Sequence, residues 1–337
     1  MNCDILQIVC DKLDSLSQVR FCQISCLTLC NCDVKSLELR ADRLTADTLQ
    51  LYPRVRCLDL SLASIKDLNR LYLLEVLDIS FTSVCNEDIK ELHNLRDLCV
   101  IANDYITDLN HLTKLEVLFL HSDSIRDSGI RGLCNLRDLH IARNKTITDI
   151  SHMTKLERLN ADNTILTDAG IRGLCFMKNL RIAGNKQITY LNHMRRLHTL
   201  DARDTRLNDN SICDLCEMGV LKIRNTGITN ISHMKRLRDL SACGPSTQLT
   251  DAGVAGLCDI RRLDISFNTQ ITDLNHMKEL RRLDARYTML TDNSIRELRN
   301  LCDVRSMHSD ITYRPELNIQ RNKLIPYLLH KSNEETE

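Results

Sequence analysis

The sequence predicts an α/β solenoid, in which short parallel strands stack into one continuous core. The first observation is a repeat, because a central leucine recurs at steps of 19 to 23 residues through most of the 337-residue chain. The second is the alternation of apolar residues around this leucine, which is the period of a strand. A fixed period of about 20 residues is typical of stacked repeat proteins. The central residues are Leu37, Leu58, Leu77, Leu98, Leu118, Leu139, Leu159, Leu180, Leu200, Leu221, Leu240, Leu263, Leu283 and Val304.

Residues 1–32 lie before the first repeat and predict two helices. The apolar residues of the first are Ile5, Ile8, Val9, Leu13 and Leu16, and those of the second are Val19, Phe21, Ile24 and Leu27. One interpretation is a helical cap, because a solenoid must cover its terminal core. The alternative rests on Asp4-Ile5-Leu6, Val9 and Leu13, followed by Val19–Ser25. This pattern resembles an F-box, which implies that Ile5, Leu6, Val9 and Leu13 contact a Skp-type adaptor of a cullin-RING ubiquitin ligase.

Each repeat opens with Leu-x-x-Leu-x-Ile or Leu-x-x-Leu-x-Ala, as in Leu136, Leu139 and Ile141. A strand therefore surrounds the second leucine. An Asn or Thr follows three residues after the strand, and we expect its side chain to turn inward and hydrogen-bond backbone groups of the buried turn. The residues are Asn103, Asn144, Asn185 and Asn268 in one series, and Thr82, Thr164, Thr205 and Thr288 in the other.

The two series continue differently, so the true unit is a pair of repeats of about 41 residues. In the first, Ile-Thr-Asp-Leu-Asn-His-Met predicts a turn or a single 3₁₀ turn. The second reads Leu-Thr-Asp-Ala-Gly-Ile, and here Asp168 or Asp251 is expected to be a helix N-cap. Ile171, Leu174 and Cys175 then fall on one face of a short helix.

These motifs resemble the leucine-rich repeat family, and specifically its members with short repeats. The resemblance covers residues 33–311 in about 14 copies. It implies a curved solenoid with a parallel sheet on the concave face, and with turns and short helices on the convex face. One repeat carries extra residues at 243–247, where we expect a bulged loop.

The C-terminal region, residues 312–329, departs from the repeat. Pro315 and Pro326 interrupt it, and it contains the apolar residues Leu317, Ile319, Leu324, Ile325, Leu328 and Leu329. We expect this segment to cap the last repeat. Residues 330–337 are polar and acidic, and are predicted to be disordered.

Composition excludes several functional classes. The 45 basic and 45 acidic residues give a formal net charge of zero, and Trp is absent. Nucleic acid is therefore an unlikely partner, because neither bulk attraction nor a base-stacking platform is indicated. No nucleophile elbow, P-loop or dinucleotide fingerprint occurs, so we predict neither an enzyme nor a bound cofactor, and no catalytic residues.

The cysteines and histidines recur at repeat positions. Cys134, Cys175, Cys216 and Cys258 are spaced by two repeats, about 10 Å, which is too far for a disulfide. We expect them to be small buried hydrophobic residues. His111, His152, His193, His233 and His276 are similarly spaced, too far apart to share a metal ion, and are expected to hydrogen-bond turn backbone. Cys22, Cys26 and Cys30 form one stripe of the second helix and predict packing rather than a zinc site.

Cellular context follows from the same residues. Free thiols without a signal peptide or a long apolar run predict a protein of the cytosol or the nucleus, without a membrane segment.

The predicted function is protein binding on the concave face, where exposed apolar and arginine side chains alternate with the core residues. The leading specific hypothesis is substrate recognition for a ubiquitin ligase through residues 1–32. The alternative is a scaffold or regulatory subunit, as similar short-repeat proteins are for phosphatases. We expect a monomer. The candidate residues are Leu62, Val76, Phe81, Ile101, Val117, Phe119, Arg181, Arg203, Arg224, Phe267, Arg286 and Tyr287.

Overall fold

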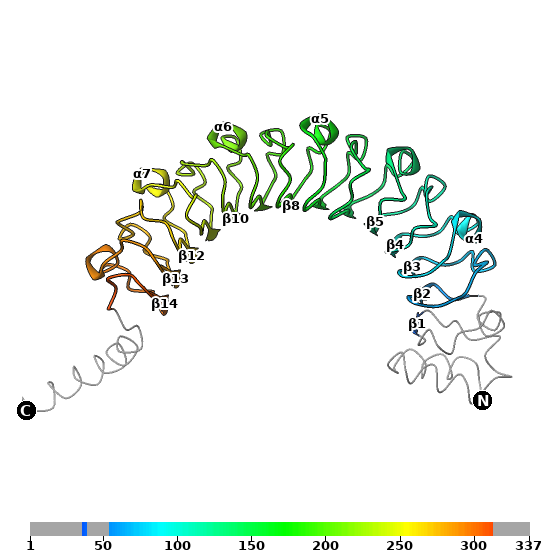
Figure 1. Cartoon of the computed structure of the whole chain (residues 1–337), viewed down its shortest axis with the longest axis horizontal. Helices are drawn as coiled ribbons and strands as arrows, with labels where there is room; N and C mark the ends of the chain where they lie inside the picture. The colour runs from blue at the N-terminus through cyan, green and yellow to red at the C-terminus, as the bar shows by residue number, and fades with distance from the viewer. Residues whose placement is uncertain (1–35, 39–53, 313–337) are drawn as a thin grey trace, which may run out of the picture. The chain divides into compact units, whose positions relative to one another are not determined.

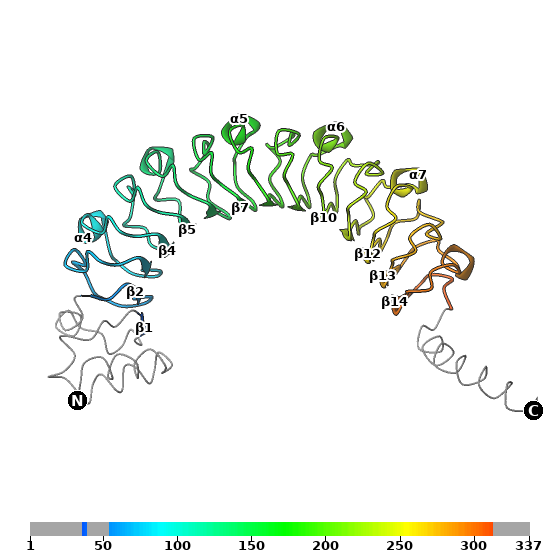
Figure 2. The same ribbon diagram turned by 180° about the vertical axis from the view of Figure 1, so that it is seen from behind.

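The computed structural model describes residues 36–38 and 54–312, so the predictions for residues 1–32 and 313–337 lie outside the described part. The chain divides into two compact units, Met1–Arg181 (unit 1) and Ile182–Glu337 (unit 2). In each unit, the strands line one face and the turns and short helices line the opposite face (Figures 1 and 2). Within each unit the strand-bearing face is the concave one, as the resemblance implied.

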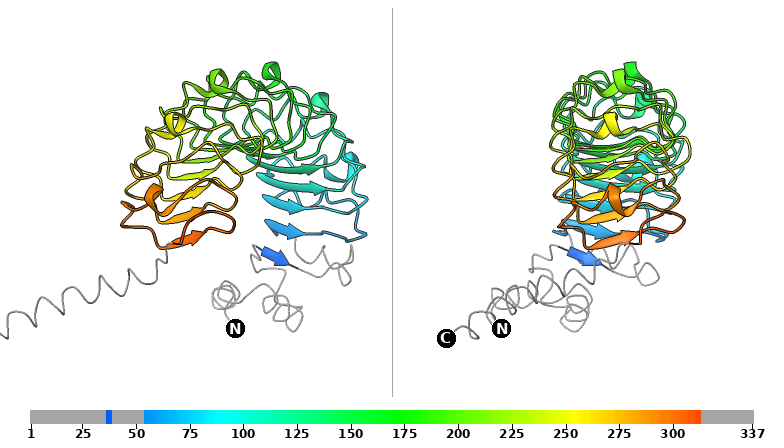
Figure 3. Two further views of the ribbon diagram at one scale, coloured as in Figure 1. Left: turned by 60° about the vertical axis from the view of Figure 1, so that its left-hand side comes forward. Right: turned by 90° about the vertical axis from the view of Figure 1, so that its left-hand side faces the viewer.

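The strands of each unit follow one another in chain order in a parallel sheet (Figure 3). The strands of unit 1 are β1 (Ser36–Glu38), β2 (Cys57–Asp59), β3 (Val76–Asp78), β4 (Asp97–Ile101), β5 (Val117–His121), β6 (Asp138–His140), β7 (Arg158–Asn160) and β8 (Asn179–Arg181). The strands of unit 2 are β9 (Thr199–Asp201), β10 (Val220–Lys222), β11 (Asp239–Ser241), β12 (Arg262–Asp264), β13 (Arg282–Asp284) and β14 (Asp303–Arg305).

The predicted register is confirmed within each unit. Leu37 pairs with Leu58, and each further central leucine of unit 1 pairs with the next, as far as Leu180. In unit 2 the same series runs from Leu200 to Val304. The central leucines of β2–β13 are at most 3% exposed. The repeat length therefore sets the register, because each chain turn returns one leucine to the same layer of the core.

The buried Asn and Thr residues behave as the sequence predicts. The Asn103 side chain accepts hydrogen bonds from the Tyr105 and Ile106 amides at 3.0 and 3.1 Å, and donates to the Val84 carbonyl at 3.0 Å. The Thr82 hydroxyl donates to the Ile79 carbonyl at 2.7 Å. These side chains satisfy backbone groups that a buried turn would otherwise leave unpaired.

Short helices occur in alternate repeats on the face opposite the strands. They are α4 (Asn86–Ile89), η3 (Asp127–Gly129) and α5 (Asp168–Ile171) in unit 1, and α6 (Asp209–Ile212), α7 (Asp251–Val254) and η4 (Asp292–Ser294) in unit 2. In η3, α5 and α7 this motif contains a glycine that packs closely against the preceding repeat. A Cβ atom at Gly253 would lie 2.1 Å from the carbonyl oxygen of Thr229 in the preceding repeat, so a larger residue at Gly253 would require the neighbouring backbone to shift.

The prediction that Asp168 and Asp251 are N-caps is wrong. The caps are Thr167 and Thr250, whose hydroxyls accept a hydrogen bond from the amide three residues later. Asp251 instead begins α7, and its two carboxylate oxygens accept from the Thr272 amide and hydroxyl of the next repeat, both at 2.7 Å. The carboxylate therefore joins neighbouring repeats rather than capping its own helix.

The prediction that Cys134, Cys175, Cys216 and Cys258 are buried is also wrong. All four are free thiols and exposed. The expected helix through Ile171, Leu174 and Cys175 explains the error, because α5 ends at Ile171 and only Ile171 and Leu174 reach the core. The chain after the helix is a turn, in which the residue following the buried leucine faces solvent.

The predicted histidine contacts are confirmed at four positions. The Nε2 atoms of His111, His152, His233 and His276 lie 3.1 to 3.2 Å from carbonyl oxygens of the preceding repeat. Since a carbonyl only accepts, Nε2 carries the proton in each case. The insertion at 243–247 forms a turn, closed by a hydrogen bond from the Thr247 amide to the Gly244 carbonyl at 3.1 Å.

Candidate protein-binding surface

The exposed side of each sheet, here called the strand face, consists of the residues directly before and after the central leucines and, in the longer strands β4 and β5, of the next alternate residue. In unit 1 it carries Val76, which is 39% exposed, together with the half-buried Val117 and Phe119. Ile101, the last residue of β4, is also half-buried. These four predicted residues therefore share the strand face of unit 1, because alternate side chains of a strand point to the same side.

The other four predicted apolar residues lie at a different place. Leu62 and Phe81 in unit 1, and Phe267 and Tyr287 in unit 2, follow the central leucine by four residues and have φ angles of 58 to 67°. We call this row of positive-φ residues the left-handed edge. Its other members are Ala102, Arg143 and Asn163 in unit 1, and Gly184, Asp204, Asn225, Gly244 and His308 in unit 2.

Glycine, asparagine and aspartate are the residues that adopt such angles readily, and five members of the left-handed edge are of these types. A left-handed conformation costs other residues about 1–2 kcal/mol. Leu62 and Phe81 are nevertheless 71% and 58% exposed, so no core packing repays this cost. Bulky residues in strained, exposed positions of this kind point to a function rather than to stability.

Unit 2 stacks three such residues. The ring centroids of Phe267 and Tyr287 are 4.6 Å apart with planes at 10°, and those of Tyr287 and His308 are 4.7 Å apart at 23°. Phe267 and Tyr287 remain 46% and 40% exposed. The adjoining Met307 is exposed, and its sulfur lies 3.7 Å from the Tyr287 hydroxyl. The three rings form a pre-ordered apolar strip that keeps its edges in solvent.

The four predicted arginines are held by aspartates. In unit 1 Arg181 pairs with Asp162 at 2.7 Å. In unit 2 Arg203 binds Asp201, and Arg286 binds Asp284, each through two hydrogen bonds of 2.7 to 2.8 Å. Arg224 pairs with Asp204 at 3.1 Å. These ion pairs orient the guanidinium groups, and in unit 2 Arg203, Arg224 and Arg286 each directly precede a residue of the left-handed edge.

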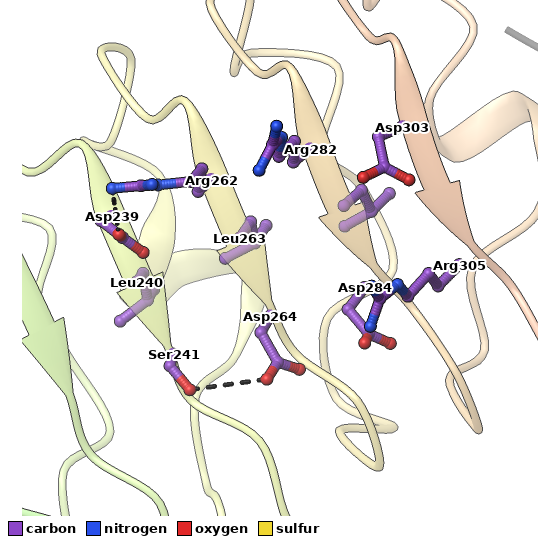
Figure 4. Close-up of a pocket in the computed structure, with 11 residues that line it drawn as sticks. Asp239, Leu240, Ser241, Arg262, Leu263, Asp264, Arg282, Asp284, Asp303 and Arg305 are labelled. Carbon is purple, nitrogen blue, oxygen red and sulfur yellow. Dashed lines mark hydrogen bonds and ion pairs between the residues drawn. The ribbon is translucent and has the colours of Figure 1, made fainter.

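An open depression of about 250 Å³ lies on the strand face of unit 2 across β11–β14 (Figure 4). Its walls carry both charges. Arg262 reaches over to Asp239 at 2.7 Å, and Arg282, Arg305, Asp264, Asp284 and Asp303 complete the polar lining. Between these charged residues, the strands that carry the buried Leu240, Leu263 and Leu283 line the depression (Figure 4).

Unit 1 contains a second polar cluster, on β5–β7. The rings of Phe119 and His140 stack at 4.2 Å, and His140 Nε2 lies 3.0 Å from Asp138 Oδ1. Asp138 is only 8% exposed and also accepts from Arg158 Nε at 2.6 Å. Burial alone would raise the pKa of Asp138, but His140 and Arg158 outweigh it and hold the pKa below its usual value.

The sequence interpretation missed His308, Asp138, His140 and Arg158. A signal for His308 was present, because it lies 21 residues after Tyr287 and occupies the same place in its repeat. The Asp138 cluster had no comparable signal. Its partners come from three different strands, and only the pairing of those strands brings them together.

Among residues 36–38 and 54–312, no group of three or more His, Cys, Asp and Glu side chains is placed to hold a metal ion. Within the same residues, no helix has the length and apolar character needed to cross a membrane.

Comparison with known proteins supports the fold. No protein-family model and no curated protein matches the chain. Solved structures do match. An internalin (inlF) of Listeria monocytogenes is 26% identical with a TM-score of 0.64, over 76% of this chain and 81% of the internalin. A leucine-rich repeat protein of Leptospira interrogans is 18% identical with a TM-score of 0.64, over 90% of this chain and 96% of that protein.

The mouse RP105/MD-1 complex also matches, with 18% identity and a TM-score of 0.63 over 78% of this chain and 52% of the matched one. Identities this low show the fold alone. The structural matches, the parallel sheet, the strand register and the buried Asn and Thr positions together show that this chain has the fold of a leucine-rich repeat solenoid.

Proposed function

We propose that this protein is a binding module, and that unit 2 contacts a protein partner through the left-handed edge at Phe267, Tyr287 and His308 and the adjoining strand face. The observation that carries the proposal is the stack of three exposed rings on strained backbone. Beyond the area that it buries, stacking returns about 0.5–1.5 kcal/mol for each pair of rings, and the left-handed conformation costs about 1–2 kcal/mol for each residue.

The stacked rings therefore add little net stability, whereas binding gives a direct reason for their exposure. Aromatic anchors surrounded by a polar rim are typical of protein interfaces. Here the rim is provided by Arg286, which its bond to Asp284 holds in place, and by the charged depression on β11–β14. An ordered platform also loses little conformational entropy when a partner binds.

The test compares the proteins that immobilised parent and Phe267→Asn/Tyr287→Asn protein retain from a cell extract. Asparagine tolerates positive φ, so the double variant should keep the parent's melting temperature while losing the partner. Tyr72→Asn is the matched control, because Tyr72 is 57% exposed but does not belong to the left-handed edge. It should retain the partner. Equal retention by all three proteins would contradict the proposal.

The ubiquitin-ligase role remains a prediction from the sequence, since Ile5, Leu6, Val9 and Leu13 lie outside the described residues. This role can be tested independently of the binding surface proposed for unit 2. Alanine variants of an adaptor-contacting residue should weaken binding to a Skp-type adaptor by about 1–2 kcal/mol without loss of stability. In a plain cap, the same truncations would each destabilise the fold by about 2–5 kcal/mol.

A further inference from the structure

One row of charged residues differs in character between the two units. The row lies at the N-terminal ends of the strands, two residues before each central leucine. In unit 1 it alternates in sign through Arg56, Glu75, Arg96, Glu116, Arg137, Glu157 and Lys178. Ion pairs join Arg56 to Glu75, Arg96 to Glu116 at 2.6 Å, Arg137 to Glu157 at 3.0 Å, and Lys178 to Glu157 at 2.6 Å. This row of unit 1 therefore neutralises itself.

In unit 2 the same position carries arginine in three successive repeats, at Arg238, Arg261 and Arg281. These are direct neighbours, because the Arg261 amide donates to the Arg238 carbonyl at 2.8 Å and the Arg281 amide to the Arg261 carbonyl at 2.9 Å. Neighbouring strands lie about 4.8 Å apart. Like charges directly opposite one another across a sheet repel and destabilise it. The row in unit 2 therefore repels itself where the row in unit 1 attracts.

Two further arginines enlarge this charge. Arg262 and Arg282 follow Arg261 and Arg281, are paired across β12 and β13, and are exposed. Of the five, Arg262 has an ion pair, with Asp239. Within the described residues of unit 2, Arg238, Arg261, Arg281 and Arg282 have none. The exposed acids nearest in sequence, Asp259 and Glu279, form no ion pair with them in this part of the chain.

We infer that these five residues, the arginine ladder, bind an acidic segment of the protein partner; the inference rests on the proposed function and names the chemistry of that partner. Guanidinium groups bind carboxylates through paired hydrogen bonds and stay charged at every physiological pH. Carboxylates on one helix face are spaced by about 5–6 Å, close to the strand spacing that separates the arginines.

The surroundings favour an acidic protein segment over a nucleic acid. The ladder spans three repeats and borders Asp264, Asp284 and Asp303 in the depression of Figure 4. A continuous phosphate backbone crossing the ladder would meet these carboxylates, whereas a peptide can place its acids beside the arginines alone. The chain as a whole offers no excess positive charge, since its net charge is zero.

The experiment titrates the full chain with a fluorescein-labelled glutamate-rich peptide at low and physiological salt, followed by fluorescence anisotropy. The peptide's glutamine twin and an oligouridylate of equal charge are the reference probes. The parent should bind the glutamate peptide preferentially, and more weakly as salt rises. Arg261→Gln/Arg281→Gln should weaken binding by about tenfold or more. The matched control is Arg96→Gln/Arg137→Gln, which removes two arginines from the equivalent repeat position in unit 1, where both are ion-paired. This variant should bind the peptide like the parent.

The outcomes are distinct. Absent binding, equal binding of the glutamine twin, equal loss in the control, or preference for the oligouridylate would each overturn the arginine proposal. The melting temperature of Arg261→Gln/Arg281→Gln should stay level or rise, because repulsion is relieved; a fall would also argue against it. The peptide titration and the partner-retention assay use different probes and different variants. Either result can therefore fail while the other holds, and the two proposals are tested separately.

Discussion

At the residue scale, the structure separates side chains that maintain the fold from those that do not. Asn268 is 1% exposed, accepts from the Gln270 and Ile271 amides at 2.8 and 3.0 Å, and donates to the Leu249 carbonyl at 3.0 Å. Phe267, one residue earlier, is exposed on strained backbone. Asn268 thus stabilises the fold, whereas Phe267 contributes to the exposed surface. Substitutions at the two positions should therefore change stability by different amounts.

Asn268→Ala should lower the free energy of unfolding by about 1–3 kcal/mol, because it leaves buried backbone groups without partners. Urea denaturation measures this change. Thr269→Ala is the control, since Thr269 is exposed. An effect of Asn268→Ala no larger than that of the control would show that the buried turn does not depend on the amide.

Thiol reactivity follows the exposure found here. In a brief pulse of N-ethylmaleimide on the native protein, Cys134, Cys175, Cys216 and Cys258 should be modified quickly, because all four are exposed. Cys99 and Cys243 should lag, since burial, the main cause, raises the pKa of both thiols and lowers the thiolate fraction. Mass spectrometry of tryptic peptides reads out each site, and the reverse order of labelling would contradict the described exposure.

At the element scale, the short helices connect repeats through their first residue. In unit 2, Asp209 and Asp251 each accept hydrogen bonds from the amide and hydroxyl of a threonine in the next repeat. Burial would raise the pKa of these carboxyls, but the threonine hydroxyl and the backbone amides outweigh it and hold the pKa below the usual value. The ionised form is therefore the one that stabilises the fold.

This gives a pH dependence with a definite sign. A carboxyl whose pKa is lower in the folded state stabilises fully above its unfolded pKa of about 3.9, and the contribution is lost as pH falls through the folded value. The parent should therefore lose stability below about pH 4 more steeply than Asp209→Asn/Asp251→Asn. Urea midpoints between neutral pH and pH 3 would show this, and parallel curves would rule out the linkage.

At the scale of the whole molecule, each repeat contacts mainly its neighbours, so damage should spread locally. In unit 1, Leu159→Asp places a charge among buried leucines and should cost several kcal/mol, about 3–5. Hydrogen exchange should rise first in β6, β7 and β8, which are directly paired. Asn160→Asp, on the outward side of the same strand, should leave exchange unchanged. Uniform exchange across unit 1 would contradict this local behaviour.

The exposed surfaces of the two units differ at this scale as well. Unit 1 presents apolar residues and a self-neutralising row of charges, whereas unit 2 presents stacked rings and the arginine ladder. The repeats share a common backbone arrangement, so these differences lie at exposed positions that the buried core does not constrain. This is where a repeat protein can acquire a partner without altering its core.

The sequence alone determined the solenoid, the strand positions and the register, because the leucine period and its two-residue alternation have only one buried arrangement. It also determined the inward Asn and Thr residues and four of the histidine contacts, since each repeats with the backbone turn that needs it. Exposed aromatic residues such as Phe267 and Tyr287 could be recognised as candidates from their places in the repeat.

Only the tertiary structure decided which of these residues meet, and in what conformation. The exposure of Cys175 depends on where α5 ends, and the bridging role of Asp251 depends on its neighbour one repeat away. The positive φ of Phe267 and Tyr287, the stacking of their rings and the unpaired arginines of unit 2 all arise between adjacent repeats. A linear pattern specifies each repeat, but contacts between residues about 20 positions apart are set by how the repeats stack.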